Sequence, residues 1–440
     1  MMHCGLLGRK LGHSYSPRIH ACLGSYRYTL IEREPEALDE FFADPAYDAF
    51  NVTIPYKEEA LARCDMVDEA ARKIGSVNTV VRREGRLWGY NTDYDGFDAL
   101  LTELSGPSLK GAKVLVLGSG GSSKTVCAVV RDRGGNPVVI SRTGAPGCRY
   151  DDIGRHYADT AVIVNTTPVG MYPSPPAAPL SLEGFCGLQA VIDLIYNPAR
   201  TALLLDAAAR GIPCANGLLM LVTQAAKASA LFRTADSASA EDSAAAEDGF
   251  FRESLSESER ATAIRGRIAC EERNLILVGM PGAGKTTVGR LCAEALGREF
   301  FDADEEVTRQ QGRSPADIIT SEGEDAFRRI ESEVLAGLCL RRHAVIACGG
   351  GAVLLPGNRT LLRQNALVIW LRRSPDQLAL EGRPLSARCG IEALYAAREP
   401  LYREVCDLTV DNDTLPEEAA RAIVRAAEMP WPVCMTACMK

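Results

Sequence analysis

The sequence predicts an α/β protein built on parallel sheets, and two glycine-rich loops carry this prediction. Each loop follows a run of aliphatic residues and precedes a stretch with helical periodicity: KVLVLGSGGSSKT at 113–125 and LILVGMPGAGKTT at 275–287. Strands that alternate with helices at this spacing form doubly wound parallel sheets. With 440 residues, the chain is too long for a single ordinary core, so we expect two or three domains.

Composition disfavours several kinds of partner. Hydrophobic residues make up 46% of the sequence and charged residues 24%, as in soluble globular proteins. The net charge of -8 disfavours nucleic acid, because neutralising phosphates requires a basic face. No stretch approaches the roughly 20 apolar residues of a membrane span, and the start MMHCGLLGRKLGHS lacks the apolar region of a signal peptide. We therefore expect a cytoplasmic monomer or homodimer whose partners are small molecules, with no nucleic acid and no membrane.

The 15 cysteines do not suggest a disulfide framework or a zinc site. Their number is odd, no C-x-x-C pair occurs, and several lie inside apolar runs. Buried or idle thiols in a reducing cytosol are the better interpretation.

The first half divides into two predicted units. Aliphatic runs at 137–144, 161–171 and 190–198 follow the first glycine loop and predict a Rossmann domain over residues 95–212. Residues 1–94 contain further strands and a hairpin with Glu84 and Gly85 near its turn. They predict a separate α/β substrate domain, onto which the helical segment within 213–233 packs back.

An acidic segment rich in alanine and serine separates the halves. Residues 234–270 are predicted to be a linker, because this composition buries too little apolar surface to order itself. Residues 250–268 are also compatible with a short polar helix. Beyond the linker, residues 271–440 contain aliphatic runs at 275–279, 298–303, 344–348 and 366–371, which predict a P-loop domain like the nucleoside-monophosphate kinases.

The first glycine loop, GSGGSS at 118–123, suits a dinucleotide. Gly118 permits the tight turn, Gly120 lets the backbone approach a pyrophosphate, and Gly121 keeps the helix close to the strand. The loop lacks glycine at the usual third position, and an ordinary strand–helix turn is the alternative.

The end of the following strand favours NADP over NAD. An NAD site places an acidic residue there, whereas this chain has Arg142 and Thr143, which suit a 2′-phosphate. A solvated arginine is the alternative.

Lys57 and Asp93 are candidates for proton transfer. Pro55 favours a helix start that places Lys57 in its first turn. The helix dipole and a nearby pocket both ease loss of the lysine proton. Asp93, which ends the hairpin strand, is a candidate partner. A surface lysine and a strand-end aspartate are the alternative.

The order of these and further motifs resembles the shikimate dehydrogenases over about residues 3–232. The motifs that carry the resemblance are GHSYSPRIH, FNVTIPYK, IGSVNTVV, GYNTDYDGF, VLGSGGSSKT, VNTTPVGM, DLIYNP and NGLLMLVTQAA. One departure is the segment 144–159, which is too short for the helix that family members usually carry there.

The resemblance implies roles for individual residues. Ser14 and Ser16 bind the substrate carboxylate; a serine-rich turn is the alternative. Lys57 is the general acid–base residue, Asp93 orients the ring hydroxyl and the lysine together, and NADPH reduces the ring ketone of 3-dehydroshikimate. The remaining implied contacts are Thr53, Asn78, Asp93 and Gln224 to the ring substituents, Gly118, Gly120, Gly121, Arg142 and Thr143 to NADP, and Met171 and Gly217 near the nicotinamide.

The second glycine loop, GMPGAGKT, fits the phosphate-loop pattern G-x-x-x-x-G-K-[ST]. Its backbone amides cradle phosphates, Lys285 reaches the outer phosphoryl oxygens, and the Thr286 hydroxyl ligates Mg²⁺. We therefore expect ATP, contacted also by Gly279, Gly282, Gly284 and Thr287.

The residues behind this loop suit a small polyhydroxylated acid as acceptor. FFDADEEV places Asp302 and Asp304 on one face of a strand end, and EGEDAFRRIE places Arg328 and Glu331 on one face of a helix. The CGGG turn at 348–351 offers backbone amides. A solvated acidic turn and surface arginines are the alternative.

These features are similar to shikimate kinases over about residues 273–416. The resemblance implies that Asp304 contacts the acceptor hydroxyls and accepts the proton, that Asp302 binds Mg²⁺ through water, and that Arg383 closes over the phosphoryl group from a lid. Guanidinium groups pair with carboxylates bidentately. The implied substrate contacts are Arg328, Arg398, Gly349, Gly350 and Gly351.

Together, the two resemblances imply a bifunctional enzyme that reduces 3-dehydroshikimate and then phosphorylates shikimate at its 3-hydroxyl. One alternative is a quinate-type dehydrogenase fused to a gluconate-type kinase. The other is a first half that only senses NADP and shikimate beside an active kinase.

Overall fold

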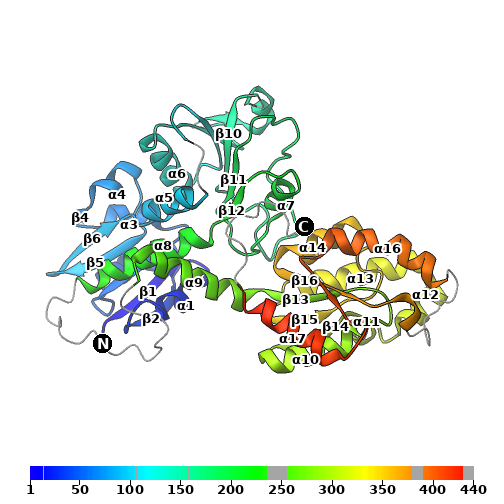
Figure 1. Ribbon diagram of the computed structural model, residues 1–440. Coiled ribbons are helices and arrows are strands. Elements are labelled where there is room, and N and C mark those ends of the chain that lie inside the picture. Colours follow the sequence, from blue (N-terminus) through cyan, green and yellow to red (C-terminus); the bar gives the residue numbers. More distant parts are fainter. Residues whose placement is uncertain are drawn as a thin grey trace.

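The computed structural model describes residues 1–12, 14–104, 108–145, 147–156, 158–234, 255–378 and 390–429. Its strands form three separate sheets, two in the first half of the chain and one in the second (Figure 1). The predicted α/β class is confirmed. In the described part of the chain, no helix is both long enough and apolar enough to cross a membrane.

The first sheet has the strand order β2-β1-β3-β5-β6-β4. Its strands are β1 (His3–Gly8), β2 (Arg27–Glu32), β3 (Ala49–Val52), β4 (Met66–Val67), β5 (Thr79–Arg83) and β6 (Arg86–Tyr90). The predicted hairpin joins β5 to β6. Glu84 and Gly85 form its turn with φ values of 49° and 75°, as a two-residue turn with a right-handed strand twist requires.

Short helices surround this sheet, and one long helix returns to it from later in the chain. They are α1 (Ser16–Ala21), η1 (Pro35–Ala37), α2 (Leu38–Ala43), α3 (Lys57–Arg63), α4 (Glu69–Ile74) and α8 (Leu218–Arg233). Ala228 and Phe232 of α8 are fully buried against Cys4, Ala49 and Val81 of the sheet. The helix predicted to pack back on the first unit therefore does so.

The second sheet has the order β12-β11-β10-β7-β8-β9, with parallel pairing throughout. Its strands are β7 (Lys113–Leu117), β8 (Asn136–Ser141), β9 (Cys148–Arg149), β10 (Thr160–Asn165), β11 (Ala190–Asp193) and β12 (Cys214–Asn216). The helices α5 (Asp93–Glu103), α6 (Gly121–Asp132) and α7 (Ala202–Ala209) accompany it. In the shortened segment after β8, the chain forms β9 and the 3-10 helix η2 (Tyr150–His156).

The third sheet is also parallel and has the order β14-β15-β13-β16-β17. Its strands are β13 (Asn274–Val278), β14 (Glu299–Asp302), β15 (Ala344–Ala347), β16 (Ala366–Arg372) and β17 (Leu408–Asp411). The helical elements are α10 (Lys285–Leu296), α11 (Ala303–Gln311), α12 (Pro315–Glu322), α13 (Glu324–Cys339), α14 (Pro356–Gln364), η3 (Pro375–Gln377), α16 (Ile391–Val405) and α17 (Pro416–Ala427).

Strand β13 explains why its sequence is a continuous aliphatic run. Ile276 and Val278 face one core of the third sheet, whereas Leu275 and Leu277 face the other. A parallel sheet that is covered on both faces needs apolar residues at successive positions.

The end of the predicted linker is an ordered helix, α9 (Glu257–Glu272). A capping box between Ser256 and Glu259 begins it. Its residues Ala261, Ile264 and Ile268 are almost completely buried in the core that α5 and α8 also line. Within the described residues, the part of 234–270 from residue 257 onward therefore packs as helix on the first half and continues into β13 (Figure 1).

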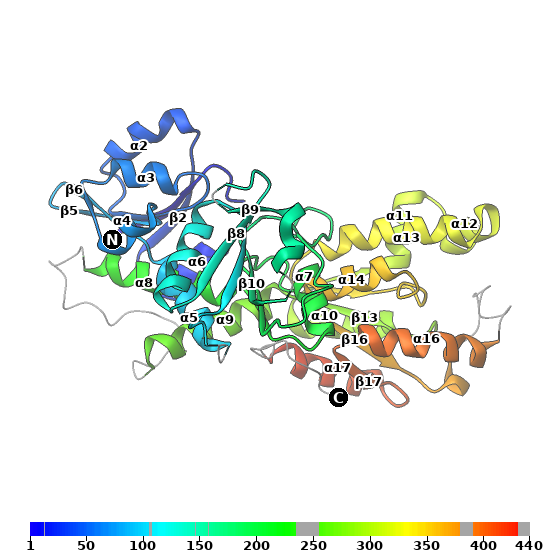
Figure 2. The same ribbon diagram turned by 90° about the horizontal axis from the view of Figure 1, so that it is seen from above.

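A second contact joins the halves through α7 and α14, which lie side by side in both views (Figures 1 and 2). Arg200 donates to the Asp407 carboxylate over 2.6 Å and to the backbone oxygen of Ala366. Its side chain is only 10% exposed. The two halves are thus connected by packed surfaces as well as by the chain.

Candidate active sites

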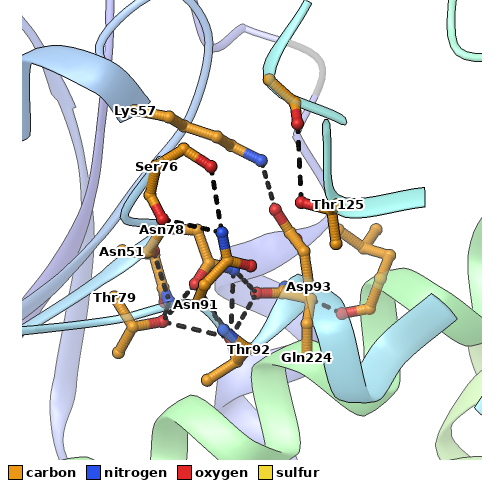
Figure 3. Close-up of polar contacts among 12 residues, drawn as sticks. Asn51, Lys57, Ser76, Asn78, Thr79, Asn91, Thr92, Asp93, Thr125 and Gln224 are labelled. Carbon is orange, nitrogen blue, oxygen red and sulfur yellow. Dashed lines mark hydrogen bonds and ion pairs between the residues drawn. The ribbon is translucent and has the colours of Figure 1, made fainter. Parts of the chain in front are cut away.

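The candidate proton-transfer pair lies where the first two sheets meet. Lys57 is the first residue of α3, as predicted, and Asp93 is the first residue of α5. The predicted strand end at Asp93 is wrong, because β6 ends at Tyr90 and Asp93 already belongs to the helix. Lys57 Nζ donates to Asp93 Oδ2 over 2.5 Å, and the two side chains are 13% and 9% exposed (Figure 3).

A buried amide network lies beside this pair. Asn78 Nδ2 donates to Thr92 Oγ1 over 3.0 Å and to Gln224 Oε1 over 3.3 Å (Figure 3). The backbone N–H of Thr92 donates back to Asn78 Oδ1 over 2.7 Å, immediately before Asp93. Three of the predicted ring-binding residues, Asn78, Asp93 and Gln224, therefore lie together. They come from the position before β5, the start of α5 and α8. Thr53 follows β3 and is half-buried.

Sequence analysis did not identify Thr92 and Asn91 as parts of this network. Asn91 donates from Nδ2 to the Ser76 backbone oxygen over 2.8 Å. The motif NTD, a run of polar residues at the end of a buried strand, was the available signal. Thr92 is the residue through which Asn78 is linked to the start of α5.

The two serines of the carboxylate-binding prediction lie together at the start of α1. The Ser16 N–H donates to Ser14 Oγ over 3.2 Å, and Ser16 is the first helical residue. Tyr15 stands between them and is only 2% exposed. The turn is thus anchored by a buried aromatic ring.

The first glycine loop has the predicted strand–turn–helix context between β7 and α6. Gly118 has a φ of +107°, and a Cβ there would lie 2.8 Å from Thr166 Oγ1, so only glycine fits. Gly120 is the N-cap of α6, and a Cβ there would meet open space. This combination leaves the exposed amides of a helix start accessible to a pyrophosphate, and the loop therefore fits a dinucleotide.

Lys57 lies beside this loop. A Cβ placed on Gly121 would be 3.8 Å from Cδ of Lys57. An ion pair of 2.5 Å between Lys124 of α6 and Glu58 of α3 also holds the start of α3 beside the loop. The candidate acid–base residue and the candidate cofactor loop are therefore neighbours.

The remaining predicted NADP contacts lie around the carboxyl ends of the second sheet. Arg142 and Thr143 follow β8 and are exposed. Met171 is 45% exposed. Gly217 is the N-cap of α8, and a Cβ there would come within 2.0 Å of the Leu194 backbone oxygen, so no side chain fits at this position.

The second glycine loop connects β13 to α10 in the geometry of a phosphate loop. Gly279, Gly282 and Gly284 have φ values of 147°, 87° and 90°. The Lys285 ammonium group donates to the backbone oxygens of Gly279 and Met280, each over 2.9 Å. The Lys285 side chain therefore folds back over the phosphate loop.

Asn412 supports this loop from the end of β17 and was missed by the sequence analysis. Its Nδ2 donates to the Ala283 backbone oxygen over 2.8 Å, and a Cβ on Gly284 would come within 2.6 Å of the same atom. Strand β17 itself was not predicted, so its end carried no recognisable signal.

Thr286 and Asp302 form the candidate Mg²⁺ position. Thr286 Oγ1 donates to Asp302 Oδ2 over 2.7 Å. A hydroxyl and a carboxylate beside a phosphate loop are ligands that suit this hard cation, so the residues fit the ion. Thr287 is exposed at the next position of α10. In the described ranges, no group of three or more histidine, cysteine or acidic residues could hold a metal by itself.

The prediction that Asp302 and Asp304 share one face of a strand end is wrong. Asp302 ends β14 and caps α11, accepting from the Asp304 N–H over 3.0 Å. Asp304 is already the second residue of that helix. The carboxylates of Asp304 and Glu331 nevertheless converge, because a Cβ on Gly349 would lie 2.9 Å and 2.7 Å from their oxygens.

Arg328 lies flat against the predicted glycine turn. The predicted pair on one helix face is confirmed: Arg328 donates from Nη1 to Glu331 over 2.7 Å. It also donates to Glu324 from two nitrogens. These bonds use three of its five donors, so the guanidinium can also bind a carboxylate ligand. A Cβ on Gly351 would collide with this guanidinium.

Burial governs the charges of this cluster. It raises the pKa of Glu331 despite the opposing attraction of Arg328. Burial would lower the pKa of Arg328, but the ion pairs with Glu331 and Glu324 outweigh this effect and raise it. Arg328 therefore stays positively charged, and its charge offsets only part of the cost of burying the Glu331 carboxylate.

Arg398 joins the cluster from α16 and is 5% exposed. Its charge acts on Glu331 and on Tyr402 one turn later. The Tyr402 hydroxyl donates to the Gly350 backbone oxygen over 2.5 Å, a support that sequence analysis missed. Arg383 lies outside the described residues.

Comparison with known protein families supports the resemblance of each half. The family model of the shikimate dehydrogenase substrate binding domain matches residues 6–80. The shikimate kinase family model matches residues 281–428. The two matches therefore fall on the first sheet and on the third.

Similar whole proteins cover the first half. Shikimate dehydrogenase (NADP(+)) of Caldanaerobacter subterraneus subsp. tengcongensis is 36% identical over 252 residues, which are 51% of this chain and 89% of the relative. That of Methanopyrus kandleri is 34% identical over 253 residues, 51% of this chain and 87% of the relative.

Two solved structures are similar to the same region. Shikimate 5-dehydrogenase from Thermus thermophilus, in complex with NADP(H) and shikimate, has a TM-score of 0.50 and 33% identity, covering 60% of this chain and 99% of that one. A chorismate mutase/shikimate 5-dehydrogenase fusion protein from Clostridium acetobutylicum has a TM-score of 0.50 and 34% identity, covering 53% of this chain and 92% of that one.

Proposed function

Since the chain belongs to the shikimate dehydrogenase family and also carries a shikimate kinase domain, we propose that it catalyses two consecutive reactions on one cyclic acid. The first half reduces 3-dehydroshikimate with NADPH, and the second phosphorylates the resulting shikimate at its 3-hydroxyl with ATP. The observation that carries the first activity is the Lys57–Asp93 pair beside Gly121 of the dinucleotide loop. This juxtaposition supports the proposal, because ketone reduction requires a proton donor beside the source of hydride.

In the first reaction, the residues of this chain orient the ring and supply a proton. NADPH, held at the first glycine loop with Arg142 and Thr143 at the 2′-phosphate, supplies the hydride when bound. Lys57 gives a proton to the ketone oxygen as the alcohol forms, and Asp93 orients the ammonium group through their 2.5 Å contact. The network of Asn78, Thr92 and Gln224 fixes these side chains beside the pair, and Asn78 and Gln224 contact the ring hydroxyls.

In the second reaction, the chain positions two anions against each other. ATP supplies the phosphoryl group at the loop that ends in Lys285, with Mg²⁺ held at Thr286 and Asp302. Arg328 and Arg398 bind the shikimate carboxylate, which orients the ring. Asp304 contacts the ring hydroxyl that attacks. Positioning and charge matter most here, because phosphoryl transfer is largely dissociative.

We also propose that both reactions take place in the cytoplasm. No disulfide joins any of the cysteines that the structure describes, which suits a reducing compartment. Fractionation of cells that express the chain, with dehydrogenase activity followed in each fraction, tests this assignment.

Separate substrate assays test the proposal against its rivals. We expect kcat/KM for shikimate to exceed that for quinate in NADP reduction, and to exceed that for gluconate in ADP formation. Preference for quinate or gluconate would replace the proposed substrates. A wild-type chain that binds NADPH and shikimate but never reduces the ketone would instead favour a sensor.

A further inference from the structure

One arginine of the kinase half reaches the candidate carboxylate turn of the dehydrogenase half. Arg342 lies between α13 and β15, and its guanidinium carbon is 5.2 Å from the centre of the Tyr15 ring. Tyr15 is the residue between Ser14 and Ser16. The contact therefore joins two predicted domains at a point next to a predicted substrate-binding group.

The same arginine is held by an ion network that spans both halves. Arg342 Nη1 lies 3.4 Å from Oε2 of Glu272, the last residue of α9. Glu272 is 6% exposed and also pairs with Arg18 of α1. The start of α1 is therefore linked to Arg342 twice, at Tyr15 directly through its ring and at Arg18 through Glu272.

Tyr196 adds the second sheet to this junction. Its ring centre is 4.9 Å from that of Tyr15, and it follows β11 by a few residues. Burial raises the pKa of Tyr15 to about 12, although the charges of Arg342 and Arg18 work against this rise. Tyr15 is thus a neutral phenol, whose ring face attracts a cation.

We propose that Arg342 is a positioning residue for the dehydrogenase reaction, acting through Tyr15 to hold the Ser14–Ser16 turn in its carboxylate-binding form. The inference rests on the proposed function. It assigns to a kinase-half side chain part of the affinity of the other half for its substrate. Arg342 acts on binding of the carboxylate and not on the transfer of hydride from NADPH or of the proton from Lys57.

The size and kind of the effect follow from this geometry. A cation over an aromatic ring, partly withdrawn from water, supports a change of about 5- to 20-fold in a binding constant. Arg342→Ala should therefore raise KM for shikimate in NADP reduction by about this factor and leave kcat within about twofold. KM for NADP and kcat/KM of the kinase reaction should stay at wild-type values.

Two further variants separate positioning from general loosening. Arg342→Lys keeps a cation near Tyr15 and Glu272 and should restore most of the lost affinity. Arg341→Ala removes the neighbouring exposed arginine, whose guanidinium lies 5.2 Å from the Phe301 ring within the kinase half, and should behave as wild type. All kinetics are measured on the full chain, with thermal melting as a check on folding.

The outcomes separate this inference from the proposed function. A selective rise in KM for shikimate in Arg342→Ala, rescued by lysine, supports it. Equal KM values for Arg342→Ala and Arg341→Ala in an active enzyme overturn it and leave the two activities standing. A matching rise in KM for NADP also overturns it, because the whole half would then be disturbed. A wild type without dehydrogenase activity overturns both.

Discussion

Asp93 accepts a hydrogen bond from Lys57 Nζ over 2.5 Å, and both side chains are largely withdrawn from water. The lysine begins α3 and the aspartate begins α5. Two helix starts from different parts of the first half therefore converge on one ion pair. This pair is where the proposed dehydrogenase chemistry takes place.

Replacing the lysine tests its role directly. Lys57→Ala should lower kcat for ketone reduction by about 10²- to 10⁴-fold, the usual contribution of a positioned acid–base group. NADPH binding, followed by fluorescence, should change little, and ADP formation from added shikimate should be unaffected. Retention of more than a tenth of the wild-type kcat would remove Lys57 from the mechanism.

The pair should also act as a unit. Because Asp93 contributes to proton transfer by orienting Lys57 and its contact with the ring should appear in KM, kcat of the double variant Lys57→Ala/Asp93→Asn should be hardly lower than that of Lys57→Ala alone. The four kcat values of this cycle give the coupling. Losses that multiply would mean that Asp93 acts on the substrate independently.

Arg328 should be indispensable to the kinase half. Arg328→Ala should reduce kcat/KM for shikimate by about 100-fold or more, because it removes the bidentate donor and leaves Glu331 buried without its cation. Arg329→Ala, at the next and exposed position of α13, is the matched control and should be near wild type. Equal effects of the two changes would place carboxylate binding elsewhere.

The magnesium prediction concerns the 2.7 Å contact between Thr286 and Asp302. Thr286→Ala should raise the Mg²⁺ concentration needed for half-maximal ADP formation by about tenfold or more. Thr286→Ser keeps the hydroxyl and should preserve the wild-type requirement. An unchanged Mg²⁺ dependence in the alanine variant would argue against this ligand.

A buried aspartate gives a prediction about pH. Asp193 ends β11 and is completely buried, where it accepts hydrogen bonds from Thr201 Oγ1 over 2.7 Å and Asn165 Nδ2 over 3.0 Å. Burial raises its pKa from 3.8 to about 7, despite these hydrogen bonds. The folded state thus binds the proton more tightly than the unfolded chain, a contribution present below about pH 4 and lost as pH rises to about 7.

The shift corresponds to at most roughly 4 kcal/mol. The advantage in Tm of Asp193→Asn over wild type should therefore grow between about pH 5 and about pH 8. Asp206→Asn, which removes a partly exposed carboxylate from α7, should show no such trend. A constant difference between Asp193→Asn and wild type across this range would contradict the assignment.

Much of the fold and of both sites could be predicted from local sequence. The glycine loops, the hairpin turn at Glu84–Gly85 and the spacing of Arg328 and Glu331 are local patterns whose geometry follows from backbone rules. The strand end expected at Asp304 was wrong, although the correct signal was also local: Asp302 followed by Glu305 is a helix-capping pattern.

Other features depend on contacts between distant residues. Helix α9 is mostly polar, and the helical spacing of Ala261, Ile264 and Ile268 is obscured by its charged residues until α5 and α8 cover them. Nothing in the sequence around Arg342 distinguishes it from a solvent-exposed arginine. Only the folded chain brings it to Tyr15.

One reaction mixture tests the central claim most directly: the purified full chain with 3-dehydroshikimate, NADPH, ATP and Mg²⁺, in which loss of NADPH and formation of ADP are followed separately. We predict that both proceed and that shikimate 3-phosphate accumulates. Lys57→Ala should slow both by about 10²- to 10⁴-fold, and added shikimate should then restore ADP formation alone. ADP formation at the wild-type rate by Lys57→Ala without added shikimate, or failure of shikimate to restore it, would contradict the claim that the second site acts on the product of the first.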